Sequence, residues 1–205
     1  MSELVTKSED SYRRGLRHIG LSYFERRVVF LDLIGEMNRL LAFHYTQAWE
    51  EGERACGFTP ADRTDQQRQR LQSEVGRDMQ SVYGLAAYIE AATARTSGGE
   101  QGKRSAWASI SARLDIWANR YNAVRSAAQT IVCADKKMVW YLGRTEKHCT
   151  DCLTYEGRVY RASTWRAAGA MPQSRRLECG GWNCDCRLVP TDASALPGRP
   201  PSPRG

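Results

Sequence analysis

The chain has 205 residues and a formal net charge of +7, with 41% hydrophobic and 26% charged residues. This balance is typical of a folded, soluble protein with one domain or two small ones rather than of a disordered chain. The longest aliphatic run, residues 28–34, contains Asp32 and is far shorter than the ~20 residues that span a bilayer. Residues 1–15 lack the apolar stretch of a secretory signal, so we expect synthesis in a reducing cytoplasm.

The first predicted element is a long helical segment over residues 10–53. Its apolar residues recur at steps of three, four or seven, the spacing of one helical face: Tyr12, Leu16, Ile19, Tyr23, Phe30, Ile34, Met37, Leu41, Tyr45 and Trp49. Arg27 interrupts this face, and three glycines weaken the helix by up to ~1 kcal/mol each relative to alanine: Gly15, Gly20 and Gly35. A kink or a division into two helices is consistent with this pattern. The acidic residues near its end are expected to face solvent: Glu50, Glu51 and Glu53.

Two further helices are predicted. Thr59-Pro60-Ala61-Asp62 is typical of a helix start, and the apolar face that follows runs from Leu71 to Ile89 and ends at Ser97-Gly98-Gly99. A third helix over residues 107–131 repeats at alternating steps of three and four, the pattern of a heptad seam: Trp107, Ile110, Leu114, Trp117, Tyr121, Val124, Ala128 and Ile131. We expect these helices to pack as an antiparallel bundle, with assembly onto another chain as the alternative use of one face.

The pattern changes after Cys133. Short strands are predicted over residues 138–142, 159–161 and 186–189, separated by loop-rich segments. The fold class predicted is therefore α+β, mainly α. It comprises a long-helix region over residues 1–136, a small β/loop zinc-knuckle module over 137–191, and a disordered, flexible Pro-rich tail over 192–205.

Five cysteines fall within 38 positions, in two groups: Cys149 and Cys152, then Cys179, Cys184 and Cys186. Two cysteines on a tight turn can face one zinc ion, and a pair from a distant loop completes a tetrahedron at ~2.3 Å from each sulfur. The preferred ligands are Cys149, Cys152, Cys184 and Cys186, with Cys179 or His148 as alternative ligands.

A structural zinc ion would contribute on the order of 10 kcal/mol to folding in a segment that offers little core of its own. Two disulfides and one free thiol form the alternative to a metal site. Cys56 and Cys133 lie on helical segments far along the chain and are expected to be ordinary buried thiols.

No enzyme active site is predicted. The chain has no glycine-rich phosphate loop, nucleophile elbow or His-Glu-x-x-His pattern. A zinc ion held by four protein ligands has no open position for water, so hydrolysis would require one ligand to dissociate. The carboxylates nearest to the cysteines in sequence are Asp151, Glu156 and Asp185.

Four motifs over residues 138–191 together resemble the C-terminal module of tailed-phage minor head proteins, the head-morphogenesis proteins of the Mu F type. They are Trp140-x-Leu142-Gly143, His148-Cys149-x2-Cys152, Gly157-x-Val159 and Cys184-x-Cys186-Arg187-Leu188-Val189-Pro190. That family often places a histidine before the last cysteine pair, and here Cys179 stands near that position.

The resemblance implies a structural virion protein at the portal vertex or in the capsid interior, made in the host bacterial cytoplasm. It would act in head assembly, DNA packaging or delivery, with the portal or major capsid protein as partner in a multi-subunit assembly and with no membrane. Residues 137–205 carry eleven Lys/Arg against six Asp/Glu, which favours non-specific contact with DNA. The arginines concerned are Arg158, Arg161, Arg166, Arg175, Arg176 and Arg187. Two alternatives remain, a regulatory nucleic-acid-binding zinc protein and a metal-dependent hydrolase.

Overall fold

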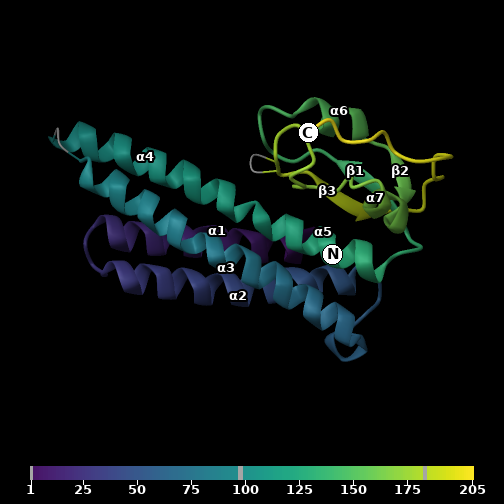
Figure 1. Ribbon diagram of the computed structural model, residues 1–205, viewed down its shortest axis with the longest axis horizontal. Coiled ribbons are helices and arrows are strands. Elements are labelled where there is room, and N and C mark those ends of the chain that lie inside the picture. The colour runs from purple at the N-terminus through teal and green to yellow at the C-terminus, as the bar shows by residue number, and fades with distance from the viewer. Residues whose placement is uncertain (1, 97–98, 182–183) are drawn as a thin grey trace. The chain divides into compact units, whose positions relative to one another are not determined.

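Helices make up most of the protein, and a small antiparallel sheet follows them, as Figure 1 shows. The structure is a computed structural model and describes residues 2–96, 99–181 and 184–205. The fold class is thus α+β, mainly α, as the hydrophobic periodicity predicted. Among the described residues, no helix combines the length and the apolar character needed to cross a bilayer.

The chain divides into two compact units, each built from segments that are distant in sequence. The helical unit comprises Met1–Thr46 and Gln72–Ala118, and the cysteine-rich unit comprises Gln47–Leu71 and Asn119–Gly205. The second unit therefore takes in helical segments as well as the predicted cysteine module.

The helical unit is a bundle of four helices: α1 (Ser2–Phe24), α2 (Phe30–Arg54), α3 (Asp65–Ala94) and α4 (Gly99–Ala118), of which α2 and α3 also extend into the other unit. The first predicted segment does divide in two, and the division falls after Phe24 rather than at a glycine. Beyond it the buried face shifts by one position, because Leu33 is fully buried and precedes Met37, whereas the predicted Ile34 is only partly covered.

Glycines of α1 allow close helix packing. A Cβ atom at Gly20 would lie 2.7 Å from the Leu114 side chain of α4, closer than real contacts allow. On the same pair of helices, Arg17 donates to Asp115 at 2.6 Å. The glycine that was expected to weaken the helix therefore lets α1 and α4 approach each other.

The predicted helix start at Thr59 belongs to a separate turn. Thr59 and Asp62 form a capping box on the 3-10 helix η1 (Pro60–Asp62), and α3 begins three residues later. A second box caps α3, since the Thr64 N–H donates to the Gln67 side chain at 2.8 Å and the Gln67 N–H donates to the Thr64 hydroxyl at 3.3 Å. The predicted helix end at Ser97-Gly98 lies outside the described residues.

The predicted third helix is also two helices, α4 and α5 (Arg120–Val132), with Asn119 between them. The buried positions of the heptad seam are nevertheless retained on both sides of the break, among them Leu114 and Tyr121. Within the cysteine-rich unit, the buried Gln173 side chain donates to the Asn119 carbonyl, which ties a distant loop to the start of α5.

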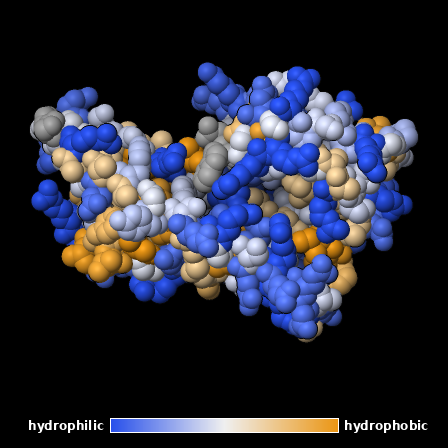
Figure 2. Space-filling view, viewed as in Figure 1, coloured by the Kyte–Doolittle hydropathy of each residue, from blue (hydrophilic) through white to orange (hydrophobic). Residues whose placement is uncertain are grey.

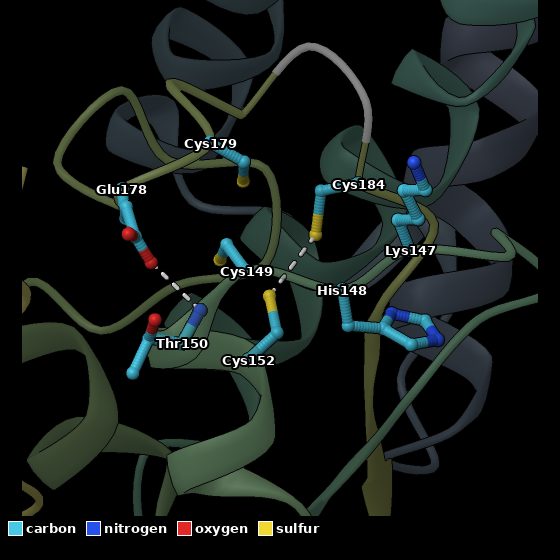
Figure 3. Close-up of a pocket in the computed structure, with 8 residues that line it drawn as sticks. All are labelled: Lys147, His148, Cys149, Thr150, Cys152, Glu178, Cys179 and Cys184. Carbon is cyan, nitrogen blue, oxygen red and sulfur yellow. Dashed lines mark hydrogen bonds between the residues drawn. The ribbon is translucent and has the colours of Figure 1, made fainter.

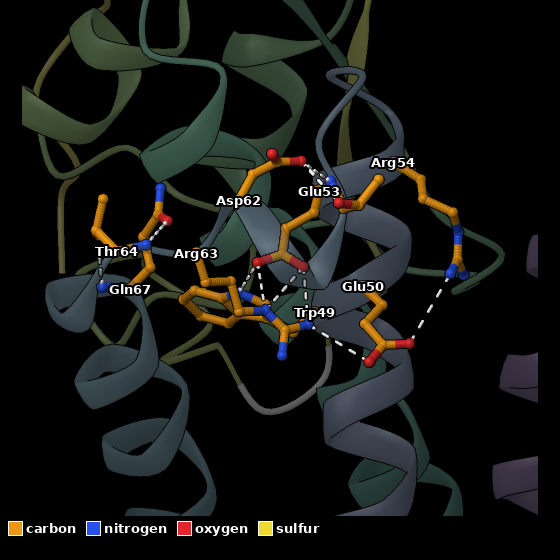
Figure 4. Close-up of polar contacts among 9 residues, drawn as sticks. Trp49, Glu50, Glu53, Arg54, Asp62, Arg63, Thr64 and Gln67 are labelled. Carbon is orange, nitrogen blue, oxygen red and sulfur yellow. Dashed lines mark hydrogen bonds and ion pairs between the residues drawn. The ribbon is translucent and has the colours of Figure 1, made fainter.

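The end of α2 carries a buried ion pair rather than a solvated acidic face (Figure 4). Glu53 is 1% exposed, accepts the Trp49 indole N–H at 2.8 Å, and pairs with Arg63 at 2.7 Å. The expectation that Glu51 and Glu53 face solvent was wrong, since both are buried. Sequence spacing could not place Arg63 against this helix end. The ion pair fixes the turn after α2 in the cysteine-rich unit.

Cys56 and Cys133 are paired as a disulfide, with their Cα atoms 5.5 Å apart. Both are buried, as expected, but they are not separate thiols. The bond joins the segment after α2 to the end of α5, 77 positions apart in sequence.

The sheet has the order β2-β1-β3, with both neighbours antiparallel to the central strand. The strands are β1 (Lys137–Tyr141), β2 (Val159–Arg161) and β3 (Arg187–Pro190), close to the three predicted strands. Two short helices, α6 (Thr150–Tyr155) and α7 (Ala162–Ala167), occupy what was expected to be loop.

An aromatic core underlies this sheet. Trp140, Tyr155 and Trp165 are fully buried, and their ring centroids lie 5.0 to 5.6 Å apart. Tyr160 meets the Trp165 ring edge to face, and the Trp165 indole donates to the Met138 carbonyl at 3.0 Å. The cysteine-rich unit therefore has more core than its loop-rich sequence led us to expect.

The Pro-rich tail is bound to the cysteine-rich unit along its length. The Leu196 N–H donates to the Val159 carbonyl at 2.8 Å, and the Tyr155 hydroxyl donates to the Pro201 carbonyl at the same distance. The tail is extended, as predicted, but it is not the disordered, flexible segment that its prolines suggested, because its backbone pairs with groups that α6 and β2 present.

Candidate metal centre

The five cysteines predicted as ligands come together from two loops of the cysteine-rich unit. The sulfurs of Cys149, Cys152 and Cys179 all lie within 4.8 Å of one another, and so do those of Cys152, Cys184 and Cys186. The Cys152 and Cys184 sulfurs are 3.6 Å apart. Thiolates bound at ~2.3 Å to one tetrahedral ion lie roughly 3.8 Å from each other, so the cluster has the dimensions of a metal site.

Four of these cysteines line a pocket of about 370 Å³ together with Lys147, His148, Thr150 and Glu178. Figure 3 shows Cys152 and Cys184 side by side, with Cys179 and His148 at opposite ends of the group. Cys186 lies outside the pocket lining and is fully buried. Its sulfur is 4.0 Å from Nδ1 of His148.

Two carboxylates hold the first cysteine pair against the loop that carries Cys179. The Glu178 carboxylate accepts the Thr150 N–H at 2.7 Å, and the Asp151 carboxylate accepts the Glu178 N–H at 2.8 Å. These reciprocal bonds fix the turn between Cys149 and Cys152 relative to Cys179. The preferred ligand set left out Cys179, which the structure places beside the first pair. The acidic residues next to the cysteines were the available signal for this arrangement.

A glycine and an aspartate position the last two cysteines. Asp185 lies between Cys184 and Cys186, and its carboxylate accepts the Arg144 N–H at 3.1 Å and the Asn122 side-chain amide at 2.8 Å. A Cβ atom at Gly143 would collide with the Asp185 backbone, so the chain after β1 can approach this loop only with glycine there. This contact explains why glycine follows the predicted strand.

The thiols share protons unequally. Hydrogen bonding to Cys179, then to Cys184 and Cys186, raises the pKa of Cys152. The contact with Cys152 lowers the pKa of Cys184, and contacts with Cys152 and Cys184 lower the pKa of Cys186 to about 4. The lowered pKa of Cys186 favours its thiolate, the form that binds metals.

The soft donors, their spacing and their burial suit a metal ion, and the five cysteines are free thiols. No protein-family model, curated protein or solved structure matches this chain. The assignment of function therefore depends on this site and on the motifs around it.

Proposed function

We propose that the chain is a structural component of a tailed-phage head, a minor head protein whose cysteine-rich unit is rigidified by zinc. One observation carries this proposal. Residues from three of the four motifs lie close together: the cysteines form the candidate metal centre, Gly143 lies against Asp185, and Trp140 packs in the same core cluster as Cys152 and Cys186.

Zinc is the ion that this donor set favours. Cysteine thiolates select zinc, copper(I) or iron–sulfur clusters, and closed tetrahedral thiolate sites are the usual structural zinc sites. The nearby carboxylates support a structural role over hydrolysis. Asp151 and Asp185 each accept a backbone N–H that holds the loops in place, which is a structural role.

The helical unit offers a surface for assembly. Figure 2 shows hydrophobic surface at the end of this unit where α1 connects to α2, and there Val29 is 65% and Leu31 is 77% exposed. Large exposed aliphatic side chains in one place are typical of surfaces that a partner covers. The proposed partners are the portal or major capsid protein.

The cysteine-rich unit supplies positive charge. Several of its arginines are exposed: Arg161, Arg166, Arg175, Arg176 and Arg187. Such residues can contact packaged DNA through phosphates without reading its sequence. They also favour the second candidate function, a regulatory nucleic-acid-binding zinc protein. That alternative requires tight duplex binding by the isolated chain, with affinity falling steeply as salt rises, whereas a head protein requires none.

The deciding experiment is mass spectrometry of purified phage particles, followed by complementation with variants. We expect the chain in particles together with the portal protein, and loss of incorporation by Leu31→Ser. Leu153→Ser is the matched control, because Leu153 is also exposed, at 56%, but lies outside this surface. Particles that lack the chain, and that form normally without its gene, would refute the proposal.

A further inference from the structure

We propose that the cysteine cluster holds two metal ions in one centre, with Cys152 and Cys184 as bridging ligands. This inference depends on the proposed metal binding and goes beyond it in the number of ions. It starts from the two groups of three sulfurs, each within 4.8 Å, which share Cys152. A residue that belongs to two ligand groups is placed to bridge two ions.

The number of donors fits two ions better than one. The two groups hold five thiols, His148 lies against Cys186 at the edge of the second group, and a single tetrahedral ion binds four ligands. Figure 3 shows Cys179 and His148 at opposite ends of the cluster, and among the described residues no ligand group contains both. Two tetrahedral ions need eight ligand positions, and six donors fill them when two donors are shared.

The distances identify the second bridge. Cys184 belongs to the group with Cys186, lies 3.6 Å from Cys152, and lines the same pocket as Cys149 and Cys179. Cys152 alone belongs to both groups of three, and Cys184 reaches the first group through its contact with Cys152 and the shared pocket lining. The first ion takes Cys149 and Cys179 as its own ligands, and both bridging cysteines complete its four.

The second ion takes the same two bridges together with Cys186 and His148. Nδ1 of His148 is 4.0 Å from the Cys186 sulfur, close to the ~3.6 Å that a nitrogen and a sulfur bound to one tetrahedral zinc require. The Thr145 hydroxyl lies 3.2 Å from the same nitrogen, and His148 would exchange this contact for the ion on binding it.

Charge balance in a buried site favours the second ion. Cys152, Cys184 and Cys186 are all at most 3% exposed. One divalent ion with four thiolates leaves two net negative charges and a fifth sulfur without a cation. Two divalent ions with five thiolates and a neutral imidazole leave one net negative charge. Because uncompensated buried charge is costly, the two-ion centre is the more stable arrangement.

The test is the zinc content of the full chain purified under thiol-reducing conditions, measured by native mass spectrometry and by elemental analysis. We expect two zinc ions per wild-type chain and one in His148→Ala and Cys186→Ser. Cys133→Ser is the matched control, since it removes a cysteine outside the cluster, and should retain two. Cadmium-substituted wild-type protein needs no variant and should give two NMR resonances coupled through the shared sulfurs.

Three other outcomes would refute the two-ion centre, metal binding as a whole, or the assignment of its ligands. One ion per wild-type chain, unchanged in His148→Ala, would refute the two-ion centre and leave the single-ion module standing. No bound metal would refute both. Two ions in the wild type and in both cluster variants would refute the assignment of His148 and Cys186 as ligands.

Discussion

Replacing Asp151 with alanine should destabilise the cysteine-rich unit and release the C-terminus. The Asp151 carboxylate is 2% exposed and lies between the two cysteines of the first pair. It accepts the Glu178 N–H at 2.8 Å and the Arg204 N–H at 3.1 Å. One side chain thus joins α6, the loop of the metal centre and the end of the tail.

The size of the effect follows from these two bonds. A hydrogen bond to a charged group contributes about 1.5 to 3 kcal/mol, and truncation leaves both buried N–H groups without an acceptor. Water can hydrogen-bond to these N–H groups in part, so we expect Asp151→Ala to lower the free energy of unfolding by about 3 to 5 kcal/mol. For a chain of this size that corresponds to a melting temperature lower by roughly 10 °C.

Urea unfolding followed by tryptophan fluorescence measures the decrease in the free energy of unfolding, and amide hydrogen exchange shows which segments are destabilised. The Glu178 and Arg204 amides should exchange much faster in Asp151→Ala than in wild type. Asp192→Ala removes an exposed carboxylate of the same tail and serves as the control. Equal unfolding midpoints for the two variants, with the Arg204 amide still protected in Asp151→Ala, would show that this carboxylate does not hold the tail.

Three further predictions concern the same unit. Gly143→Ala should destabilise the cysteine-rich unit by several kcal/mol, because the added Cβ would collide with backbone atoms. Gly84→Ala is the control, since Gly84 lies in an open helical position, and it should be neutral or stabilising by up to ~1 kcal/mol. Thermal melts of the two variants measure the difference. Hydrogen bonds from Thr150 of α6 hold the pKa of the Glu178 carboxyl below its ordinary 4.5. The ionised carboxylate therefore stabilises the folded state fully above pH 4.5, and this stabilisation is lost as the pH falls through the lowered pKa. Glu178→Gln should therefore lose stability less steeply than wild type below pH 4.5, as denaturation across a pH series would show. Cys133→Ser should lower stability by about 4 kcal/mol, because its disulfide closes a long loop, and wild type in reductant should approach the variant in urea unfolding.

Local periodicity predicted the helical faces but not where the helices break. Ile110, Leu114 and Trp117 are buried as the heptad seam indicated, because repeats of three and four place them on one face whatever follows. The break at Asn119 involves Gln173, which is 54 positions away, and no local pattern contains that contact. The same limit applied at Glu53, whose burial depends on Arg63 folding back from the next turn.

Cysteine spacing predicted which residues meet, but not how the surrounding chain holds them. Cys-x2-Cys and Cys-x-Cys are metal-ligand spacings whatever the fold. The helix α6 escaped prediction because its six residues contain less than two turns, too few to show a period. Asp151 was notable in the sequence only as a carboxylate near the cysteines, and its partner Arg204 is 53 positions away.

The aromatic core changes what metal removal should do. The sequence predicted a module with little core of its own, for which a zinc ion would supply much of the folding free energy. The rings of Trp140, Tyr155 and Trp165 pack directly against one another, so this unit has an aromatic core besides the cysteines. Chelation should therefore raise amide exchange by orders of magnitude in the loops over residues 143–149 and 178–186, while β1 amides stay protected.

The measurement is hydrogen exchange with and without chelator on the disulfide-intact chain. Simultaneous loss of protection in β1 and in the loops would mean that the ion, and not the aromatic core, determines the fold of this unit.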